Sequence, residues 1–456
     1  MKIILQLVIL ALCYSCGVSQ HYSTKSKRAI KYYEEAMQLP STIDPETGYP
    51  NFKGACVQLE KAIEKDPNFW EAHLVAGEFY EKLRNYTPAI EHFKEAIRIN
   101  PNHLSTGGTY YYLSVLLLKQ GRYDECLHYL DEYMLFKNAD PEKKRKAIKL
   151  KNDCLFAKEA IQNPVNFNPV NIGPGINTKY PEYFPTITVD GKSILFTRRI
   201  PDSRIRGPIP EQEDFYVSEL RNNSWSKAVP MPRNINTISN EGAPTMAPDG
   251  RSLVFVACQN PGGDYGEGRT GKGSCDLFYT KRIGNNWTNP ENLKGGVNSF
   301  NWESQPSLSA DGKTIYFVRG KFFSGGTMSS DIYKAELQAD GTWSNPERLS
   351  DVINTPFEEE SVLIHPDGKT LYFASRGHQG MGGTDLFMSR MDVNGEWTKP
   401  VNLGYPINTS ADENSLMVDA SGEVAFFASD REGGYGGLDI YYFELPVHLR
   451  GRSINR

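Results

Sequence analysis

The order of hydrophobic and polar residues changes character once along the chain. From about Ser23 to Gln162 apolar residues recur three and four positions apart, which is the period of an amphipathic helix. From about Val165 to Leu445 they alternate with polar residues in short runs separated by turn residues, which is typical of strands. We therefore expect a helical unit over residues 23–162, a β unit over residues 163–446 and a tail over residues 447–456.

The clearest helical stretch runs from Trp70 to His103. Its small residues would let two helices approach closely, its aromatic residues would fill the space between them, and a proline would end the second helix. In this respect it resembles a tetratricopeptide repeat (TPR), although His73 and Ala76 stand where that repeat usually has Trp and Leu. The matching positions are Gly77, Tyr80, Ala89, Phe93, Ala96 and Pro101.

Helical pairs on either side of this stretch extend the resemblance to about three repeats, which is near the minimum for a stable stack. A basic helix from about Asp140 to Ile161 is expected to cap the stack. The tyrosine clusters Tyr32–Tyr33 and Tyr110–Tyr112 have two interpretations, a peptide-binding groove or packing between helices. In either case the resemblance implies a protein-binding α-solenoid.

The β region contains five copies of one pattern, and a repeat built from strand residues is read as a radial array. Each copy has an Asn, then a Glu five residues later, an Asp-Gly or Ser-Gly turn, and a Phe. A further Asp opens a later strand. The repeated Glu residues are Glu182, Glu241, Glu303, Glu359 and Glu413, and the strand-opening Asp residues are Asp214, Asp276, Asp331, Asp385 and Asp439.

Each repeat divides into four expected strands, here called A to D, which is the content of one propeller blade. The fifth repeat stops after its third strand near Leu445. A matching segment, residues 165–172, precedes the first repeat, because Pro169–Gly173 resembles Pro400–Gly404. We predict a multidomain α plus all-β chain, with the α-solenoid followed by a five-bladed β-propeller that this N-terminal strand closes, leaving no open edge.

The first residues read as a targeting segment. Lys2 is followed by an apolar run from Ile3 to Leu12, which is too short to span a bilayer and has the proportions of a signal peptide. Ser15-Cys16 resembles a bacterial lipobox, so we expect a lipoprotein signal peptide over residues 1–15, lipidation of Cys16 and a linker over residues 16–22. An ordinary signal peptide is the alternative. The absence of an acidic run after Cys16 favours the periplasmic side of the outer membrane.

Seven cysteines are present. Cys56, Cys126 and Cys154 fall on helical patterns and are expected to be small buried residues. Cys258 and Cys275 bracket one glycine-rich loop, and in an oxidising compartment we expect them to form a disulfide.

Candidate chemistry is scarce. The repeated Glu could suggest a ring of catalytic carboxylates, but a catalytic residue needs to occur only once, so we expect a structural role with an Arg such as Arg198, Arg376 or Arg431. No zinc-protease spacing and no serine-hydrolase elbow is present. The sequence therefore predicts no catalytic residues, no metal, no cofactor and a chain that is not an enzyme.

The loops between strands B and C differ in length and charge, and binding residues concentrate on such loops. They share one face of a propeller with the D–A loops. The alternative is that the charged residues of these loops are only solvated and bind no partner. The candidate partner-binding residues on this face are Arg204, Arg206, Tyr265, Arg269, Lys272, Lys321, Phe322, Phe323, His378 and Tyr435.

Residues 408–413 and 427–441 resemble the WD40-like repeats called PD40, which are related to the propeller of TolB. With the lipobox and the TPR stretch, the whole chain resembles outer-membrane lipoproteins of Bacteroidetes-type bacteria, some of which serve in type IX secretion and gliding. Many of these continue into an OmpA-like domain that this chain lacks, so direct peptidoglycan binding is not expected.

The net charge of −5 gives no indication of nucleic-acid binding. The resemblance implies a non-enzymatic scaffold that is lipid-anchored at the outer membrane and binds envelope or secretion-system proteins through the TPR groove and the propeller face. The alternative is a propeller that binds or hydrolyses a glycan or peptide at the B–C loop face.

Overall fold

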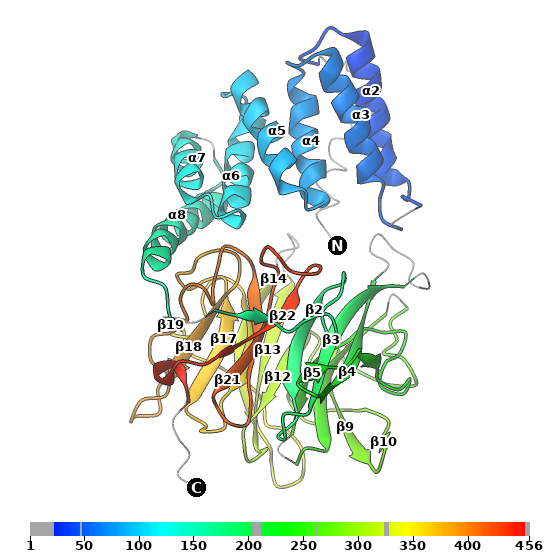
Figure 1. Cartoon of the computed structure of the whole chain (residues 1–456), viewed down its shortest axis with the longest axis vertical. Helices are drawn as coiled ribbons and strands as arrows, with labels where there is room; N and C mark the ends of the chain where they lie inside the picture. The colour runs from blue at the N-terminus through cyan, green and yellow to red at the C-terminus, as the bar shows by residue number, and fades with distance from the viewer. Residues whose placement is uncertain are drawn as a thin grey trace. The chain divides into compact units, whose positions relative to one another are not determined.

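The computed structural model describes residues 22–451 except 46–47, 138, 167, 203, 205–210, 248, 261 and 323–327. The described chain separates into two compact units, and the boundary between them falls at Leu155 and Phe156. The first unit is helical and the second is mostly β, as predicted (Figure 1). Among the described residues, no helix combines the length and the apolar character needed to cross a membrane.

The described part of the first unit contains seven α-helices, and consecutive helices pack as the pairs α2–α3, α4–α5 and α6–α7. A short 3-10 helix, η2 (Leu39–Ser41), follows the first helix. The bounds are α2 (Lys27–Gln38), α3 (Phe52–Lys65), α4 (Trp70–Lys82), α5 (Tyr86–Ile99), α6 (Leu104–Lys119), α7 (Tyr123–Leu135) and α8 (Pro141–Gln162).

The α4–α5 pair shows why the TPR positions have these residues. A Cβ placed on Gly77 would lie 2.6 Å from the ring of Phe93, so only glycine permits this approach of the helices. Ala89 and Ala96 are fully buried on α5. The small and aromatic residues of the pattern are thus the ones that set the distance between the helices.

The second unit repeats a set of three antiparallel strands five times. The first strands are β2 (Glu182–Ile187), β7 (Glu241–Met246), β12 (Trp302–Leu308), β16 (Glu359–Ile364) and β20 (Glu413–Val418). The second strands are β3 (Ser193–Pro201), β8 (Ser252–Cys258), β13 (Thr314–Phe322), β17 (Thr370–Ser375) and β21 (Val424–Ser429). The third strands are β4 (Glu211–Arg221), β9 (Cys275–Ile283), β14 (Met328–Glu336), β18 (Asp385–Arg390) and β22 (Asp439–Glu444).

Short strands pair with the outer side of each third strand. They are β5 (Ser224–Trp225), β6 (Val229–Pro230), β10 (Asn286–Trp287), β11 (Glu291–Asn292), β15 (Glu347–Arg348) and β19 (Val401–Asn402). The last repeat takes this strand from elsewhere, because β1 (Val170–Asn171) pairs with β22, with Val170 opposite Tyr442. The strand that precedes the first repeat therefore lies in the sheet of the last repeat.

The first strands neighbour one another across repeats. β2 lies beside β7 and β20, β12 lies beside β7 and β16, and β16 lies beside β20. Each first strand thus has two other first strands as neighbours. One parallel pair, Trp302 with Cys275, also joins the second and third repeats into a nine-stranded sheet.

Each first strand carries a bulge two residues after the repeated Glu, where the register with the second strand shifts. The bulged residue has a positive φ in all five repeats although none is glycine, which is an uncommon conformation for such residues. These residues are Phe184 (51°), Ala243 (49°), Gln305 (54°), Ser361 (32°) and Ser415 (59°).

The Asp-Gly and Ser-Gly pairs form the turns between first and second strands, where the glycines have φ values of 62° to 75°. The repeated Phe is at most 1% exposed in every repeat and packs in the core between sheets. The residues are Gly191, Gly250, Gly312, Gly368 and Gly422 for the turns, and Phe196, Phe255, Phe317, Phe373 and Phe427 for the core.

The segment after β22 differs from the tail that we expected from residue 447. It forms a short 3-10 helix, η3 (Val447–Leu449), and Leu449 is buried in the core of the fourth and fifth repeats. The hydroxyl of Tyr372 donates a hydrogen bond to the Leu449 carbonyl oxygen. The β unit therefore extends past residue 446, because an apolar side chain in this segment reaches the core.

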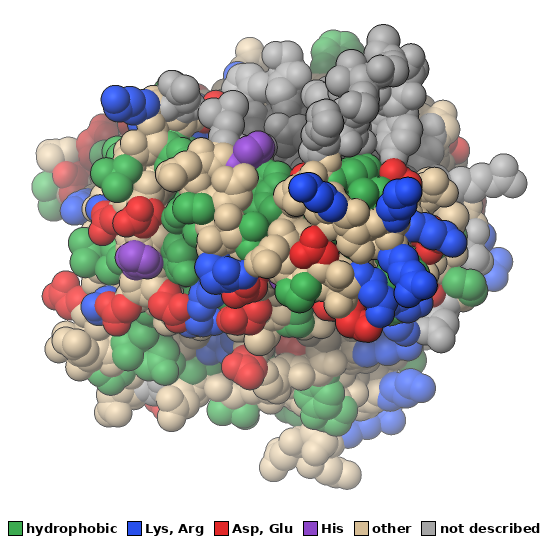
Figure 2. All heavy atoms as spheres, turned by 90° about the horizontal axis from the view of Figure 1, so that it is seen from above, with side chains coloured by type: hydrophobic (Ala, Val, Ile, Leu, Met, Phe, Trp, Pro, Cys, Tyr) green, Lys and Arg blue, Asp and Glu red, His purple; other side chains and the backbone are tan. Residues whose placement is uncertain are grey.

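Charged side chains of both signs are interspersed with hydrophobic ones on the face drawn in Figure 2, in keeping with the small net charge of −5.

Candidate functional site

The five repeated Glu side chains are fully buried at the start of the first strands. Each carboxylate accepts hydrogen bonds from the backbone N–H and the side-chain hydroxyl of the residue four positions earlier. In the first repeat these are the Thr178 N–H at 2.9 Å and its Oγ1 at 2.6 Å. The equivalent residues are Thr237, Ser299, Thr355 and Thr409. The carboxylates thus close the loop that enters each repeat.

Four of these carboxylates also pair with a guanidinium. The distances are 2.7 Å for Arg198 with Glu182, 2.8 Å for Arg269 with Glu241, 2.7 Å for Arg319 with Glu303 and 3.2 Å for Arg431 with Glu413. Each guanidinium also donates to loop carbonyls and lies over two aromatic rings, as Arg198 does over Phe196 and Tyr216. These contacts give the repeated Glu an architectural role.

The fourth repeat departs from this arrangement. Arg376, which we expected to pair with the repeated Glu, instead lies 2.8 Å from Asp412 and 3.6 Å from Glu360. His378 occupies the place of the guanidinium, because its ring packs against Phe373 and Phe387. Burial raises the pKa of Glu359 to about 7, against the hydrogen bonds that favour the carboxylate.

Three residues of the predicted loop face make contacts within the loops. Tyr265 and Arg269 are buried, since the Tyr265 hydroxyl donates to the Gly273 carbonyl and Arg269 pairs with Glu241. His378 is half-buried, and its Nε2 lies 2.8 Å from the Ile353 carbonyl oxygen. Tyr265 and Arg269 are therefore enclosed by the loops that they hold together, whereas His378 is partly exposed.

The other candidates on this face are exposed or outside the described residues. Arg204, Lys272, Lys321 and Tyr435 are exposed. Arg206, Phe323 and the side chain of Phe322 are outside the described residues, as is Cys16.

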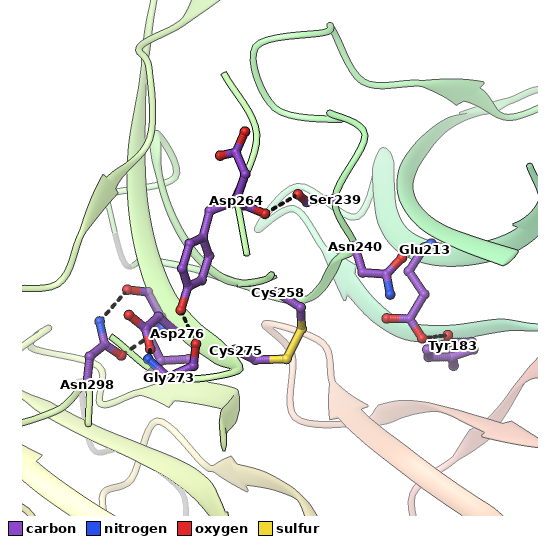
Figure 3. The surroundings of a disulfide bond; sticks show 12 residues. Tyr183, Glu213, Ser239, Asn240, Cys258, Asp264, Gly273, Cys275, Asp276 and Asn298 are labelled. Atoms are coloured by element: carbon purple, nitrogen blue, oxygen red, sulfur yellow. Dashed lines mark hydrogen bonds between the residues drawn. A yellow bond between two sulfur atoms is a disulfide. The ribbon is translucent and has the colours of Figure 1, made fainter. Parts of the chain in front are cut away.

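Cys258 and Cys275 are joined by a disulfide (Figure 3). They stand directly opposite each other at the end of β8 and the start of β9. The loop that they close carries Arg269 back to Glu241, 28 positions earlier in the chain. The disulfide therefore supports the loop that supplies the second repeat with its guanidinium.

The Asp residues that we expected to open the third strands also make hydrogen bonds or ion pairs, although Asp214 and Asp331 lie three residues inside β4 and β14. The Asp276 carboxylate accepts from the Lys272 and Gly273 N–H groups, and Asp439 accepts from the Tyr435 N–H and from Asn171. Asp385 accepts from the Met381 N–H, and Asp331 pairs with Arg348. Asp214 accepts from the side chain of Gln212.

The structure contains two polar clusters that the sequence analysis did not identify. Each one includes the residue directly after a repeated Glu, which is Tyr183 in the first repeat and Glu360 in the fourth. In the first, the Tyr183 hydroxyl donates to Glu213 Oε1 at 2.5 Å (Figure 3). Arg199 lies 3.3 Å from Glu211 in the same neighbourhood. Burial raises the pKa of Glu213, while the Tyr183 hydrogen bond and the Arg199 charge act in the opposite direction.

The second cluster is Glu360, Arg376 and Asp412, with the Asp412 N–H donating to Asp430 Oδ1 at 2.8 Å. Burial raises the pKa of Glu360, with Arg376 opposing it. Tyr183 and Glu360 occupy equivalent positions of β2 and β16, and β20 neighbours both strands. In both clusters half-buried carboxylates thus lie beside arginines. Both clusters are at the end of the sheets where the loops between the second and third strands, the predicted B–C loops, are found.

A cavity of about 320 Å³ lies at the opposite ends of the same first strands. Its wall repeats one apolar position five residues after each Glu, and it has few charged groups. The residues at this position are Ile187, Met246, Leu308, Ile364 and Val418. Among the described residues, no group of three His, Cys, Asp or Glu side chains is placed to hold a metal ion.

The comparison with protein families identifies a tetratricopeptide repeat at residues 70–103, which confirms this part of the resemblance. A TPR suggests protein partners. No curated protein matches the chain. A solved TPR protein, YrrB, described as having an unusual peptide-binding site, is 26% identical over 30% of this chain and 62% of its own, with a TM-score of 0.24.

Other solved structures are similar over about three fifths of this chain. The α-L-arabinofuranosidase PaAbf62A of Podospora anserina is 12% identical, covers 61% of this chain and 96% of its own, and has a TM-score of 0.40. A puromycin-hydrolyzing peptidase of Mycobacterium tuberculosis is 15% identical over 61% of this chain and 39% of its own, with a TM-score of 0.31.

These comparisons correct the prediction that the chain is not an enzyme. Several of the similar structures are glycoside hydrolases, including further glycosidases from Bacteroides species, at 8–12% identity and TM-scores of 0.40 or less.

Proposed function

We propose that this chain joins a protein-binding TPR unit to a five-bladed β-propeller that takes a glycan or peptide ligand on its loop side. The observation that carries the ligand site is the Tyr183–Glu213 pair, a half-buried carboxylate held by a tyrosine hydroxyl. Binding sites of this kind place a few polar groups on a rigid scaffold, where they fix the orientation of the ligand.

The propeller assignment has two supports. The circuit of first strands, in which each has two neighbours, is the arrangement expected of blades around an axis. The pairing of β1 with β22 supplies the fourth strand that the fifth repeat lacks. The resemblance to PD40 repeats agrees with both.

The ligand chemistry follows from the clusters. Carboxylates accept hydrogen bonds from saccharide hydroxyls and from peptide N–H groups, and arginines donate to their oxygens. A carboxyl with a raised pKa beside a second carboxyl is also a pair that general acid–base cleavage can use, so turnover of the ligand is the second function proposed for this site. Glu213 and Glu360 have raised pKa values, and each has another carboxylate nearby, Glu211 or Asp412.

Binding is tested by titrating the purified protein with defined oligosaccharides and peptides, and turnover by assaying released products. We expect Glu213→Gln to weaken binding at least tenfold. Glu219→Gln is the matched control, because Glu219 is an exposed residue of the same strand. If Glu213→Gln binds and turns over every ligand as the unsubstituted protein does, the site is elsewhere and the proposal is wrong.

The location of the protein is a separate proposal. Lipidation of Cys16 would hold both units at the outer membrane, and such tethering raises the effective concentration of partners in an envelope assembly such as a secretion or gliding machine. Cys16→Ala is expected to release the protein from the membrane fraction. Retention of the variant in that fraction would contradict this proposal without affecting the ligand site.

A further inference from the structure

We propose that the junction between the first two helical pairs is a pH-sensitive joint, whose hydrogen bonds are complete only while His92 carries an extra proton. Glu60 of α3, His73 of α4 and His92 of α5 are connected in one series of hydrogen bonds, here called the His92 network. α4 packs against both α3 and α5. The network therefore runs from the pair α2–α3 to the pair α4–α5.

The His92 network is built from four contacts. His73 Nε2 lies 3.1 Å from the Pro67 carbonyl oxygen, and His73 Nδ1 lies 3.1 Å from His92 Nδ1. His92 Nε2 lies 3.0 Å from Glu60 Oε1, to which the Tyr80 hydroxyl also donates at 2.9 Å. His73 is 6% exposed and the side chain of His92 is 13% exposed. Both rings are thus largely shielded from water.

The chemistry of the four contacts determines where the hydrogens lie. A carbonyl oxygen only accepts, so His73 Nε2 carries a hydrogen, and Nδ1 of the neutral ring is then an acceptor. His92 Nδ1 must therefore donate to His73. His92 Nε2 faces a carboxylate oxygen and must donate as well. Every contact is made only when both nitrogens of His92 carry a hydrogen, which is the charged imidazolium form.

The charges around the two rings agree with this assignment. The hydrogen bond from His92 lowers the pKa of Glu60, so this carboxyl is ionised. Burial lowers the pKa of His73 and the His92 charge acts in the same direction, against the hydrogen bond to Pro67, so His73 stays neutral. The Tyr80 ring stacks on the His92 ring at 5.5 Å and 5°, and an aromatic face attracts a cation. His92 is thus the group that takes the proton.

Other titratable groups near the network do not replace this proton. Among the described residues, Cys56 of α3 and Glu95 of α5 also act on members of the network. Burial raises the pKa of Cys56 to about 12, so the thiol is uncharged. Glu95 is paired with Arg98 at 2.7 Å. In the described part of the chain, α2 and α6 contribute no hydrogen bond to the two rings.

Loss of the proton leaves one contact unmade. A neutral His92 has a single N–H, so either Nδ1 or Nε2 then directs a lone pair at its neighbour. A buried polar group without its hydrogen bond is destabilising, so the ring or the Glu60 carboxylate must move away. The stability that the His92 contacts provide is therefore present at low pH and is lost as the pH rises and His92 releases its proton.

The two rings are followed individually, because the lowered pKa of His73 stabilises the fold at high pH and so acts oppositely on global stability. The full chain is labelled with 15N-histidine for NMR, and His73→Asn and His92→Asn assign the signals. At about pH 5.5 we expect His92 to be an imidazolium and His73 to be neutral with its hydrogen on Nε2. On raising the pH, both rings should change with one midpoint. A charged His73 or two separate midpoints would overturn the proposal.

A matched pair of variants tests the role of the carboxylate. Glu60→Gln removes the charge beside His92 and keeps the shape of the side chain. The midpoint of the His92 signals should fall by on the order of 1 pH unit, which is a tenfold weaker hold on the proton. Glu64→Gln is the control on the same helix, because Glu64 pairs with Lys65, and it should leave the midpoint unchanged. An unchanged midpoint in Glu60→Gln would contradict the proposal.

Hydrogen exchange tests whether the joint itself responds to the proton. After correction for the chemical pH dependence of exchange, amides of α3 and α5 should exchange about threefold faster at about pH 8.5 than at about pH 5.5. This difference should disappear in Glu60→Gln and persist in Glu64→Gln. Equal corrected rates at both pH values in the unsubstituted chain would show that the proton does not control the junction, and the proposal would be wrong.

Discussion

His378 Nε2 lies 2.8 Å from the carbonyl oxygen of Ile353. In the other four repeats a guanidinium makes this contact, as Arg431 does to the Ile407 carbonyl at 2.6 Å. The fourth repeat therefore keeps the hydrogen bond to the loop and the stacking on two aromatic rings, but it lacks the permanent charge beside the repeated Glu. This difference makes Glu359 the most informative of the five carboxylates.

The stability of the fourth repeat should depend on pH through Glu359. Its pKa is raised from 4.5 to about 7, so protonation stabilises the folded state. This contribution is fully present below about pH 4.5 and is lost as the pH rises through about 7, and it amounts to about 3 kcal/mol. Glu359→Gln mimics the protonated form, so we expect it to exceed the unsubstituted protein in stability at pH 8 and to match it at pH 4.5.

Urea unfolding at both pH values measures this difference. Glu219→Gln serves as the control, because Glu219 is exposed and should leave the pH dependence unchanged. An identical pH dependence for Glu359→Gln and the unsubstituted protein would show that Glu359 stays ionised.

Burial also raises the pKa of Glu241, to about 8, with the charge of Arg269 opposing the shift. The equivalent change in the second repeat should nevertheless have the opposite sign, because Arg269 stays behind in the core. Glu241→Gln leaves the buried guanidinium of Arg269 without its carboxylate, which costs about 3–5 kcal/mol. The double variant Glu241→Gln with Arg269→Met should recover a large part of this loss, since both charges are then gone. Denaturant midpoints at pH 7 test both statements, and a double variant no more stable than the single one would contradict them.

The helix spacing of the TPR should depend on Gly77. Gly77→Ala brings a methyl group to 2.6 Å from the Phe93 ring and should destabilise the helical unit by about 1–3 kcal/mol. Gly108→Ala is the control, because a Cβ at Gly108 has no atom within 4 Å, and alanine favours a helix by about 1 kcal/mol. Thermal melts followed by helical circular dichroism should therefore shift in opposite directions.

Loss of the Cys258–Cys275 disulfide should weaken the Arg269 contact. The double variant Cys258→Ala with Cys275→Ala is expected to lose about 3 kcal/mol, the value for a loop of this size. In that background Glu241→Gln should cost less than in the intact protein, because the loop no longer holds Arg269 against Glu241. Additive losses across this cycle would show that the disulfide and the ion pair act independently.

The sequence predicted the parts of the fold that repeat at a fixed spacing. The Asp-Gly turns, the buried Phe and the small residues of the TPR recur in register, so their roles could be read before the structure. The arginine that pairs with a repeated Glu could be predicted only where it lies near the end of the second strand, as Arg198 does. Arg269 comes from a loop and His378 is a different residue type, so neither follows from the spacing.

Two other features left no sequence signal. The bulged residues with a positive φ are Phe, Ala, Gln and Ser. Because a positive φ is usually expected at glycine, the sequence contains no indication of these bulges. The Tyr183–Glu213 pair joins residues of two strands that are 30 positions apart. Contacts of this kind depend on how the strands are brought together, which local patterns do not encode.

The pairing of β1 with β22 also has a consequence for biosynthesis. The segment that leaves the ribosome immediately after the helices finds its hydrogen-bonding partner only when all five repeats have been translated. The helices, whose contacts are local, are free to fold early, whereas the β unit holds unpaired edges until synthesis is almost complete. A stalled or truncated product that lacks β22 would keep those edges exposed, and proteases and chaperones would be able to bind them.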